Sequence, residues 1–249
     1  MTHVKKHESF CFNRYKIKNI RLVFINRGIK MDEEPIFKIS KYKIAENDLP
    51  AFHRVEEAHV TNSIPAEPGT LMIANGHEGV SGVTNYDIEL YRNSKAFDIH
   101  SMSDYFDAYD NAVEKMAKEK KIWDLKSEWM TTKSKEALDS YADNFVIRLA
   151  KVELKKGKHD KFARIVKKEM RNSMAKEPGV EILFAGSNVG NPDEWLFFEV
   201  YVNNDAYNKH VNTPWFGEYI DDSKNIVENK ELHDIVRDTM AVQGPIVME

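Results

Sequence analysis

The chain has 249 residues, of which 42% are hydrophobic and 31% are charged, and its formal net charge is −4. These values are typical of a soluble globular protein, and the charge balance gives no indication of a nucleic-acid partner. No apolar run approaches the roughly 18 residues that span a bilayer, so an ordinary transmembrane helix is excluded. Cys11 is the single cysteine, which rules out an internal disulfide and predicts a reducing, cytoplasmic location.

The first thirty residues contain eight Lys or Arg and one acidic residue. Their apolar stretch, Ile20 to Ile25, is too short for a signal peptide. Three interpretations stay open: a basic arm for anionic partners, a poorly packed extension, and upstream sequence ahead of a natural start at Met31. The composition favours the last two, so we expect residues 1–33 to be a disordered basic extension.

Two long stretches repeat each other at an offset of 110 residues. Asn62 to Gly76 reads NSIPAEPGTLMIANG, and Asn172 to Gly186 reads NSMAKEPGVEILFAG. The alignment needs no gap between residues 36 and 110, and 16 of those 75 positions are identical. Solenoid repeats have periods of about 20–50 residues, so this longer period indicates a duplicated domain. The sequence predicts domains at residues 34–130 and 145–249, with 131–144 as a linker.

Both copies show the same order of strand and helix patterns. First strands are expected at Ile36–Ile44 and Val146–Leu154, and helices follow at Leu49–Ile64 and His159–Met174. Each helix ends at Glu-Pro-Gly, because proline cannot continue a helix and glycine tolerates the turn that follows. The second strands, hairpin loops and third strands are expected at Thr70–Asn75 and Val180–Ala185, at 76–84 and 186–193, and up to Tyr91 and Tyr201.

Two short helices follow each third strand. In the second copy, Thr213-Pro214 offers a good N-cap followed by proline at the first helical position, three residues after His210. Final strands are expected near Lys121–Trp129 and Thr239–Val247. Such a β-α-β-β-α-β unit forms a four-stranded antiparallel sheet with helices on one face. The other face needs cover, so we expect the two copies to pack sheet against sheet, as an intramolecular version of a dimer.

The region around each histidine follows one pattern, at residues 89–109 and 199–219. It reads Glu-x-Tyr, then Asn-x-x-Ala-[Phe/Tyr]-x-x-His-x-x-[Ser/Thr]-x-[Tyr/Trp]-Phe-x-x-Tyr. This pattern resembles the antibiotic biosynthesis monooxygenase family. The resemblance covers about residues 34–249 and implies an α+β fold of two tandem ferredoxin-like domains forming an intramolecular dimeric α+β barrel. The second copy keeps the family's His-x-x-Thr-Pro, whereas the first copy has Ser103-Asp104 and departs from it.

The resemblance implies a cofactor-independent monooxygenase that acts on a quinol or another electron-rich aromatic compound. Such chemistry requires an apolar slot, a proton acceptor and hydrogen bonds for the developing anion. His210 suits the base role because the pKa of histidine lies near 6.5. Expected catalytic residues are His210, Tyr219 and Glu199, and expected substrate-binding residues are Trp195, Phe197, Tyr201, Trp215, His100 and Tyr109. Structural roles stay open for all of them: a helix-closing histidine, an ion-paired glutamate and core aromatic residues.

Neither a metal nor haem is expected as a cofactor. The nine histidines form no metal-binding motif. The resemblance implies that haem-degrading relatives have a histidine and a tryptophan where both copies here have tyrosine. Expected partners are a small aromatic substrate and O₂, without nucleic acid or a membrane span, and a further homo-oligomer stays open. The alternative function is a non-catalytic small-ligand-binding or stress protein on the same barrel, which the polar strand face of Asn85, Asp87 and Glu89 supports.

Overall fold

The computed structural model describes residues 29–30, 34–133 and 145–248. The first half consists of β2 (Ile36–Ile44), α1 (Leu49–Ala66), β3 (Thr70–Glu78), β4 (Thr84–Tyr91), α2 (Ser94–Ser101), α3 (Asp104–Met116) and β5 (Ala117–Thr132). The second half consists of β6 (Val146–Leu154), α5 (His159–Lys176), β7 (Val180–Asn188), β8 (Asn191–Tyr201), α6 (Asn204–His210), α7 (Pro214–Ser223) and β9 (Val227–Val242). Apart from β8, each element of the second half begins 110 positions after its counterpart.

Eight strands close into a barrel. Their order is β5-β2-β4-β3-β9-β6-β8-β7, and β5 also pairs with β7. All of these pairings are antiparallel. The barrel closes because β5 and β9, each 16 residues long, pair with a strand of their own half and with a strand of the other half. The expected α+β barrel is therefore confirmed.

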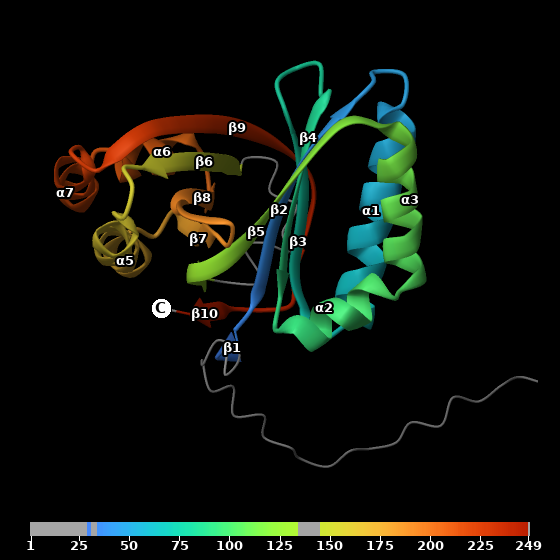
Figure 1. Cartoon of the computed structure of the whole chain (residues 1–249), viewed down its shortest axis with the longest axis horizontal. Helices are drawn as coiled ribbons and strands as arrows, with labels where there is room; N and C mark the ends of the chain where they lie inside the picture. The colour runs from blue at the N-terminus through green and yellow to red at the C-terminus, as the bar shows by residue number, and fades with distance from the viewer. Residues whose placement is uncertain (1–28, 31–33, 134–144, 249) are drawn as a thin grey trace, which may run out of the picture.

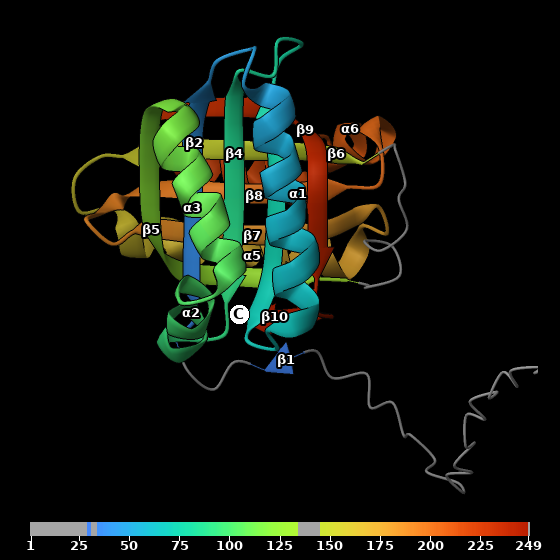
Figure 2. The same cartoon turned by 90° about the vertical axis from the view of Figure 1, so that its right-hand side faces the viewer.

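The helices cover the outside of this barrel. Helices α1, α2 and α3 lie over the strands of the first half, and α5, α6 and α7 lie over those of the second (Figure 1). Figure 2 shows α1 and α3 side by side across the outer face of the first sheet. The barrel interior is apolar and takes side chains from both halves, among them Phe37 and Phe184, whose rings meet edge to face at 6.0 Å. Burial of each such side chain contributes roughly 1.5–3 kcal/mol.

Two expected strand boundaries are wrong. The last strand of the second half is β9 at Val227–Val242 rather than Thr239–Val247, and β10 (Ile246–Met248) is a separate strand. Strand β5 likewise begins before Lys121, and it continues into the expected linker. Both long strands begin with charged residues that are exposed on both faces, so the alternation of apolar and polar residues that marks a half-buried strand is missing there.

The N-terminal boundary also differs from the expectation. Strand β1 (Ile29–Lys30) pairs in parallel with β10, which pairs antiparallel with β5. Residues 29–30 therefore belong to the sheet, and assigning them to a disordered extension is wrong. The rest of that extension, residues 1–28 and 31–33, and residues 134–144 of the expected linker lie outside the described residues.

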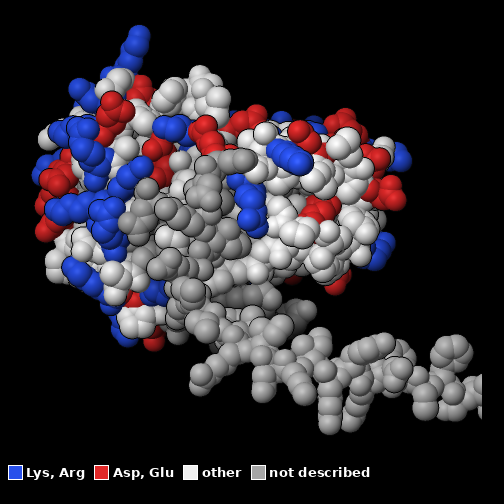
Figure 3. Space-filling model, turned by 90° about the horizontal axis from the view of Figure 1, so that it is seen from below, with Lys and Arg blue, Asp and Glu red and all other residues white. Residues whose placement is uncertain are grey.

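The surface carries both signs of charge. In Figure 3, Lys and Arg gather mainly over the second half, with acidic side chains among them. One pair links two helices of this half: Lys168 of α5 lies 2.7 Å from Glu218 of α7. None of the helices in the described ranges has both the length and the apolar composition needed to cross a membrane.

Two equivalent glycines lie where the halves join. Gly76 of β3 faces β9, and Gly186 of β7 faces β5. A Cβ atom at Gly76 would lie 2.5 Å from Ile235 Cγ2 and 2.6 Å from the Val236 carbonyl oxygen. The close approach of the two backbones therefore excludes a side chain at this seam.

We expect Gly76→Ala to lower the free energy of unfolding by about 1–3 kcal/mol, the usual cost of overpacking. The midpoint of thermal unfolding should fall by roughly 2–10 °C, measured by circular dichroism. Gly244→Ala is the control, because its new Cβ would have no atom within 4 Å. An unchanged midpoint for Gly76→Ala would mean that the seam can widen without cost.

Candidate functional site

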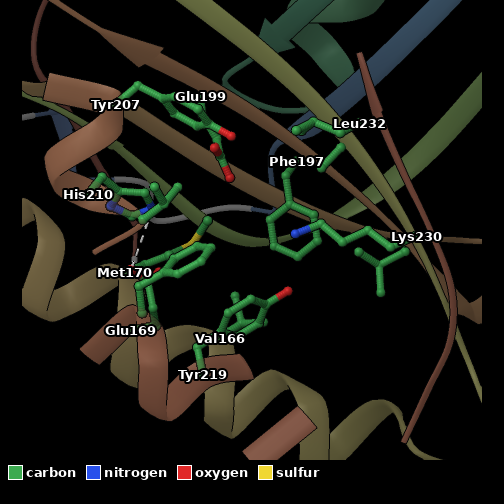
Figure 4. Close-up of a pocket in the computed structure, with 14 residues that line it drawn as sticks. Val166, Glu169, Met170, Phe197, Glu199, Tyr207, His210, Tyr219, Lys230 and Leu232 are labelled. Carbon is green, nitrogen blue, oxygen red and sulfur yellow. Dashed lines mark ion pairs between the residues drawn. The ribbon is translucent and has the colours of Figure 1, made fainter. Parts of the chain in front are cut away.

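A cavity lies in the second half, between the outer face of β6 and β8 and the helices α5, α6 and α7 (Figure 4). Most of its lining is apolar, and its polar groups include Glu169, Glu199, His210 and Tyr219. Lys230 and Leu232 of β9 line it as well, and both are exposed to solvent. The cavity volume is about 40 Å³, which holds a few water molecules.

Local sequence places these side chains. Phe197 and Glu199 are two residues apart on β8 and therefore share its helix-facing side. On α5, Val166, Glu169 and Met170 have the spacing of one helical face. His210 ends α6, and Thr213 fixes the chain directly after it. The Thr213 hydroxyl donates to the His210 carbonyl oxygen at 2.8 Å and accepts from the Phe216 amide at 3.2 Å.

Two carboxylates face the ring of His210, which is 2% exposed. Glu177 Oε1 lies 3.2 Å from Nδ1, and Glu169 Oε1 lies 3.9 Å from Nε2. The Trp215 indole N–H donates to Glu177 Oε1 at 2.7 Å, and the Ser173 hydroxyl donates to Glu169 Oε1 at 2.6 Å. The imidazole is therefore held between two carboxylates whose own positions are fixed.

Burial and charge shift the pKa of both groups at the cavity. Burial raises the pKa of Glu169 to about 7, with the charges of Glu199 and Glu177 adding to it and His210 opposing it. Burial alone would lower the pKa of His210, but the hydrogen bond to Glu177 and the nearby carboxylate charges outweigh it, so that pKa lies above its ordinary value. The site therefore pairs a carboxyl that titrates near neutrality with a histidine that is readily protonated.

Four of the nine sequence-predicted site residues line this cavity: Phe197, Glu199, His210 and Tyr219. Tyr201 lies outside it, although its hydroxyl donates to Glu199 Oε2 at 2.8 Å. Trp195 packs against Phe162, with ring centroids 5.1 Å apart.

Trp215 faces a different hollow. That hollow of about 540 Å³ is also lined by Glu177, Lys209 and Thr213, and it does not include His210. Trp215 is linked to the cavity residues indirectly, because its indole N–H lies within hydrogen-bond distance of Glu177 Oε1 and of Ser173 Oγ, at 2.7 Å and 3.0 Å. Its expected substrate contact is not part of the geometry around His210.

Sequence reasoning missed Glu169 and Glu177. Glu177 belongs to the Glu-Pro-Gly that ends α5, and that motif suggested only a helix stop. Glu169 gave a usable signal, because it lies on the buried face of α5 between Val166 and Ser173. A carboxylate on the apolar face of a helix needs a partner.

In the first half, the corresponding region between the outer face of the sheet and the helices α1, α2 and α3 is packed and polar. We call these two regions the first-half layer and the second-half layer. His59, Asp87 and Glu56 stand where the second half has Glu169, Phe197 and Val166. The rings of His59 and Tyr109 stack at 4.3 Å, and the Tyr109 hydroxyl donates to Asp87 Oδ2 at 2.9 Å. His100 Nδ1 lies 2.8 Å from Glu67 Oε2. The predicted residues His100 and Tyr109 therefore lie in this layer, apart from the cavity of the second half.

Glu169, Glu177 and His210 are close enough together to hold a cation, since one ligand atom of each lies within 4.8 Å of the others. Both ring nitrogens of His210 already face carboxylates, however. A protonated imidazole offsets one of these carboxylate charges.

Buried Glu56 in the first-half layer should make the stability of the protein depend on pH. Glu56 is 1% exposed, and neither of its carboxyl oxygens has a hydrogen-bond partner among the described residues. Burial, with the charges of Asp87 and Asp238, raises the pKa of Glu56 well above its ordinary value. The folded chain therefore holds this proton more tightly than the unfolded chain does. Stability falls as pH rises above the unfolded pKa, which is near 4.5.

We expect Glu56→Gln to be more stable than the wild type at pH 8, by about 1–3 kcal/mol, because the amide cannot ionise. At pH 5 the gain should shrink, since wild-type Glu56 is then protonated. Denaturant unfolding at both pH values measures the difference. A gain of equal size at the two pH values would show that ionisation of Glu56 is not the cause.

Comparison with known proteins agrees with this architecture. A family profile described as antibiotic biosynthesis monooxygenase matches residues 145–222. No curated protein matches the chain. The crystal structure of a proposed monooxygenase from Lactobacillus acidophilus NCFM is 46% identical, with a TM-score of 0.80, and the match covers 87% of this chain and 100% of that chain.

Two further structures share the fold at low identity. A proposed monooxygenase from Fusobacterium nucleatum is 19% identical, with a TM-score of 0.81 over 88% of this chain and 99% of that one. An anthrone oxidase-like protein is 7% identical, with a TM-score of 0.57 over 86% and 96%. The identity to the Lactobacillus protein over its whole length, together with the profile match, shows that this chain belongs to the antibiotic biosynthesis monooxygenase family.

Proposed function

We propose that the protein is a monooxygenase that oxidises a quinol or another electron-rich aromatic compound without a bound cofactor, in the cavity of the second half. One observation carries this proposal: Glu169, with a pKa of about 7, and His210 line a cavity whose other walls include Phe197, Phe216 and Tyr219. Family membership supports an oxidoreductase of the monooxygenase type. The match of the family profile to residues 145–222 supports the second half as its location.

Glu169 is the proton acceptor in this proposal. A general base works best when its pKa lies near the operating pH, and burial raises the pKa of Glu169 to about 7. His210, with its raised pKa, supplies positive charge beside the phenolate that forms. The sequence suggested His210 as the base, but a histidine held between two carboxylates is better suited to stabilising an anion than to removing a proton.

The substrate supplies all the electrons. Glu169 takes the phenolic proton, and the phenolate transfers one electron to O₂. The two radicals then combine, so that a C–O bond forms at the ring. Glu169 returns the proton to the peroxide oxygen. As the O–O bond breaks, the ring carbon loses its hydrogen as a proton, which joins the departing hydroxide to form water. One oxygen atom stays on the ring and the other leaves as water, so a hydroquinone and O₂ give a hydroxyquinone and H₂O with no external reductant.

Substrate entry requires movement at the mouth of the cavity. A volume of about 40 Å³ is too small for an aromatic ring. Leu232 is 47% exposed, and Lys230 extends over the Phe216 ring with its Nζ 5.9 Å from the centroid. Both side chains are on β9 and can turn towards solvent. We propose that this turn admits the substrate and that their return excludes water.

We also propose that the two halves are copies of one ferredoxin-like domain, paired within the chain as two subunits would pair in a dimer. The strand order of each half, last-first-third-second, supports this origin. A cytoplasmic location is part of the same proposal, and the single cysteine supports it.

Glu169→Gln should lower kcat/KM for O₂ uptake with a reduced quinone by roughly 10²–10⁴-fold, because the amide cannot accept the proton. In the wild type, kcat/KM should rise with pH through about 7 as Glu169 ionises, and the variant should lose this rise. An oxygen electrode and a panel of reduced benzoquinones and naphthoquinones provide the measurement.

Glu56→Gln is the matched control, since it makes the same change at a buried glutamate of the first half. It should keep the wild-type rate. An equal loss in Glu56→Gln would place the activity in the first half instead. Quenching of tryptophan fluorescence by these compounds without O₂ uptake would support the alternative, a small-ligand-binding protein.

His210→Ala tests the electrostatic role separately. Loss of a positive group beside a developing anion costs roughly 10²–10³-fold in kcat. The rise of kcat/KM with pH should remain in His210→Ala, because Glu169 is still present. Disappearance of that rise would instead identify His210 as the base.

A further inference from the structure

Three side chains of the first half converge on one point without sharing a sequence motif. His59 comes from α1, Glu89 from β4 and His100 from α2, and one ligand atom of each lies within 4.8 Å of the others. The Nε2 atoms of the two histidines are 3.0 Å apart, and Glu89 Oε1 is 3.8 Å from His100 Nε2. All three residues are buried, with at most 4% exposed.

Neighbouring groups orient two of the three. Glu67 Oε2 lies 2.8 Å from His100 Nδ1, and a carboxylate can only accept, so Nδ1 carries the proton and Nε2 presents its lone pair towards His59. The Tyr91 hydroxyl donates to Glu89 Oε1 at 2.8 Å. A carboxylate behind a histidine is the arrangement that orients metal-binding imidazoles.

His59 is 1% exposed, and its Nε2 atom faces that of His100. Its Nδ1 has no hydrogen-bond partner among the described residues. One nitrogen of this buried ring therefore stays unsatisfied whichever of the two carries the proton, and an unsatisfied buried polar group is costly.

The surroundings are rich in buried carboxyl groups. The layer holds four buried carboxyl groups, those of Glu56, Glu67, Asp87 and Glu89. In the described part of the chain, the only basic side chain within 4.0 Å of any of them is His100. Buried carboxylates without cations are costly and must take up protons or bind a cation.

We propose that His59, His100 and Glu89 bind a divalent first-row transition metal ion of the Zn²⁺ or Fe²⁺ type. Two imidazoles and one carboxylate are a ligand set that both ions use. Two nitrogens bound to one ion at about 2.1 Å lie about 3.0 Å apart in octahedral geometry and about 3.4 Å apart in tetrahedral geometry, and the observed His59–His100 separation of 3.0 Å is close to both. The third ligand atom, Glu89 Oε1, lies 3.8 Å from His100 Nε2.

Comparison with the second half predicts which of the two halves binds the ion. Glu169 stands in place of His59, so His210 faces a carboxylate where His100 faces a second imidazole. A soft or borderline metal prefers the two nitrogens. The ion should therefore bind to the first half alone, in a stoichiometry of one per chain.

The test uses the full-length chain produced in medium supplemented with Zn²⁺ or Co²⁺, so that the ion can enter the buried site during folding. After gel filtration in chelator-free buffer, we expect one metal ion per chain by elemental analysis. The Co²⁺ form should show ligand-field absorption bands. Relative to chelator-treated protein, bound Zn²⁺ should raise the midpoint of thermal unfolding by roughly 5–10 °C at 100 times its Kd.

His59→Gln and Glu89→Gln should each remove the bound ion and its absorption bands, and Glu67→Gln should weaken binding by roughly 10–100-fold. Glu89→Gln keeps an acceptor for Tyr91, so it serves as the fold-preserving variant if His59→Gln does not fold. His77→Gln is the control, because His77 belongs to a separate group with His53 and Asp238.

Metal-free wild-type protein would overturn the proposal. Loss of the ion in His77→Gln, with retention in His59→Gln and Glu89→Gln, would overturn it too and place the ion in the other group. Retention in His77→Gln with loss in both other variants supports the proposal, and circular dichroism checks that each variant is folded.

Discussion

The pairing of two strand edges determines the rest of the structure. If each half folded alone, β3 and β7 would present a row of unpaired backbone N–H and C=O groups. The other half supplies the missing partner in both cases: β9 pairs with β3, and β5 pairs with β7. Each of these two strands has 16 residues, about three times the usual length, so one strand can serve both sheets. Glycine at the two seams permits the close approach, and neither half can complete its hydrogen bonding without the other.

Because the barrel is closed, the first-half and second-half layers lie on its outside. The interior is filled with apolar side chains from both halves, and the cavity that contains His210 lies between a sheet and its helices. These two layers lie on opposite sides of the barrel (Figure 1). The second layer has become largely apolar around His210, whereas the first has accumulated buried carboxyl groups.

Local signals in the sequence predicted local structure well. Strand β2 spans Ile36–Ile44 as its alternation indicated, and Thr213 caps α7 because capping depends on residues three positions apart. The charged start of β9 gave no such signal. Applying the repeat offset to the first copy's expected strand gives residues 231–239, which lie within β9. The candidate site was found only where its residues were close in sequence. Glu169 and His59 come from helices far upstream of their histidines, and only the fold brings them into contact.

One position on the first helix of each half sets the chemistry of its layer. In the second half, Glu169 faces His210 Nε2 at 3.9 Å, and the pair can share charge: the carboxylate favours the protonated ring, and the ring moderates the pKa of the carboxyl. In the first half, His59 faces His100 Nε2 at 3.0 Å, and neither ring gains from a second positive charge. Two facing imidazoles need either one proton between them or a metal ion. The exchange of carboxylate for imidazole thus places a carboxyl beside the histidine of one layer and a second imidazole beside the histidine of the other, on an otherwise common framework.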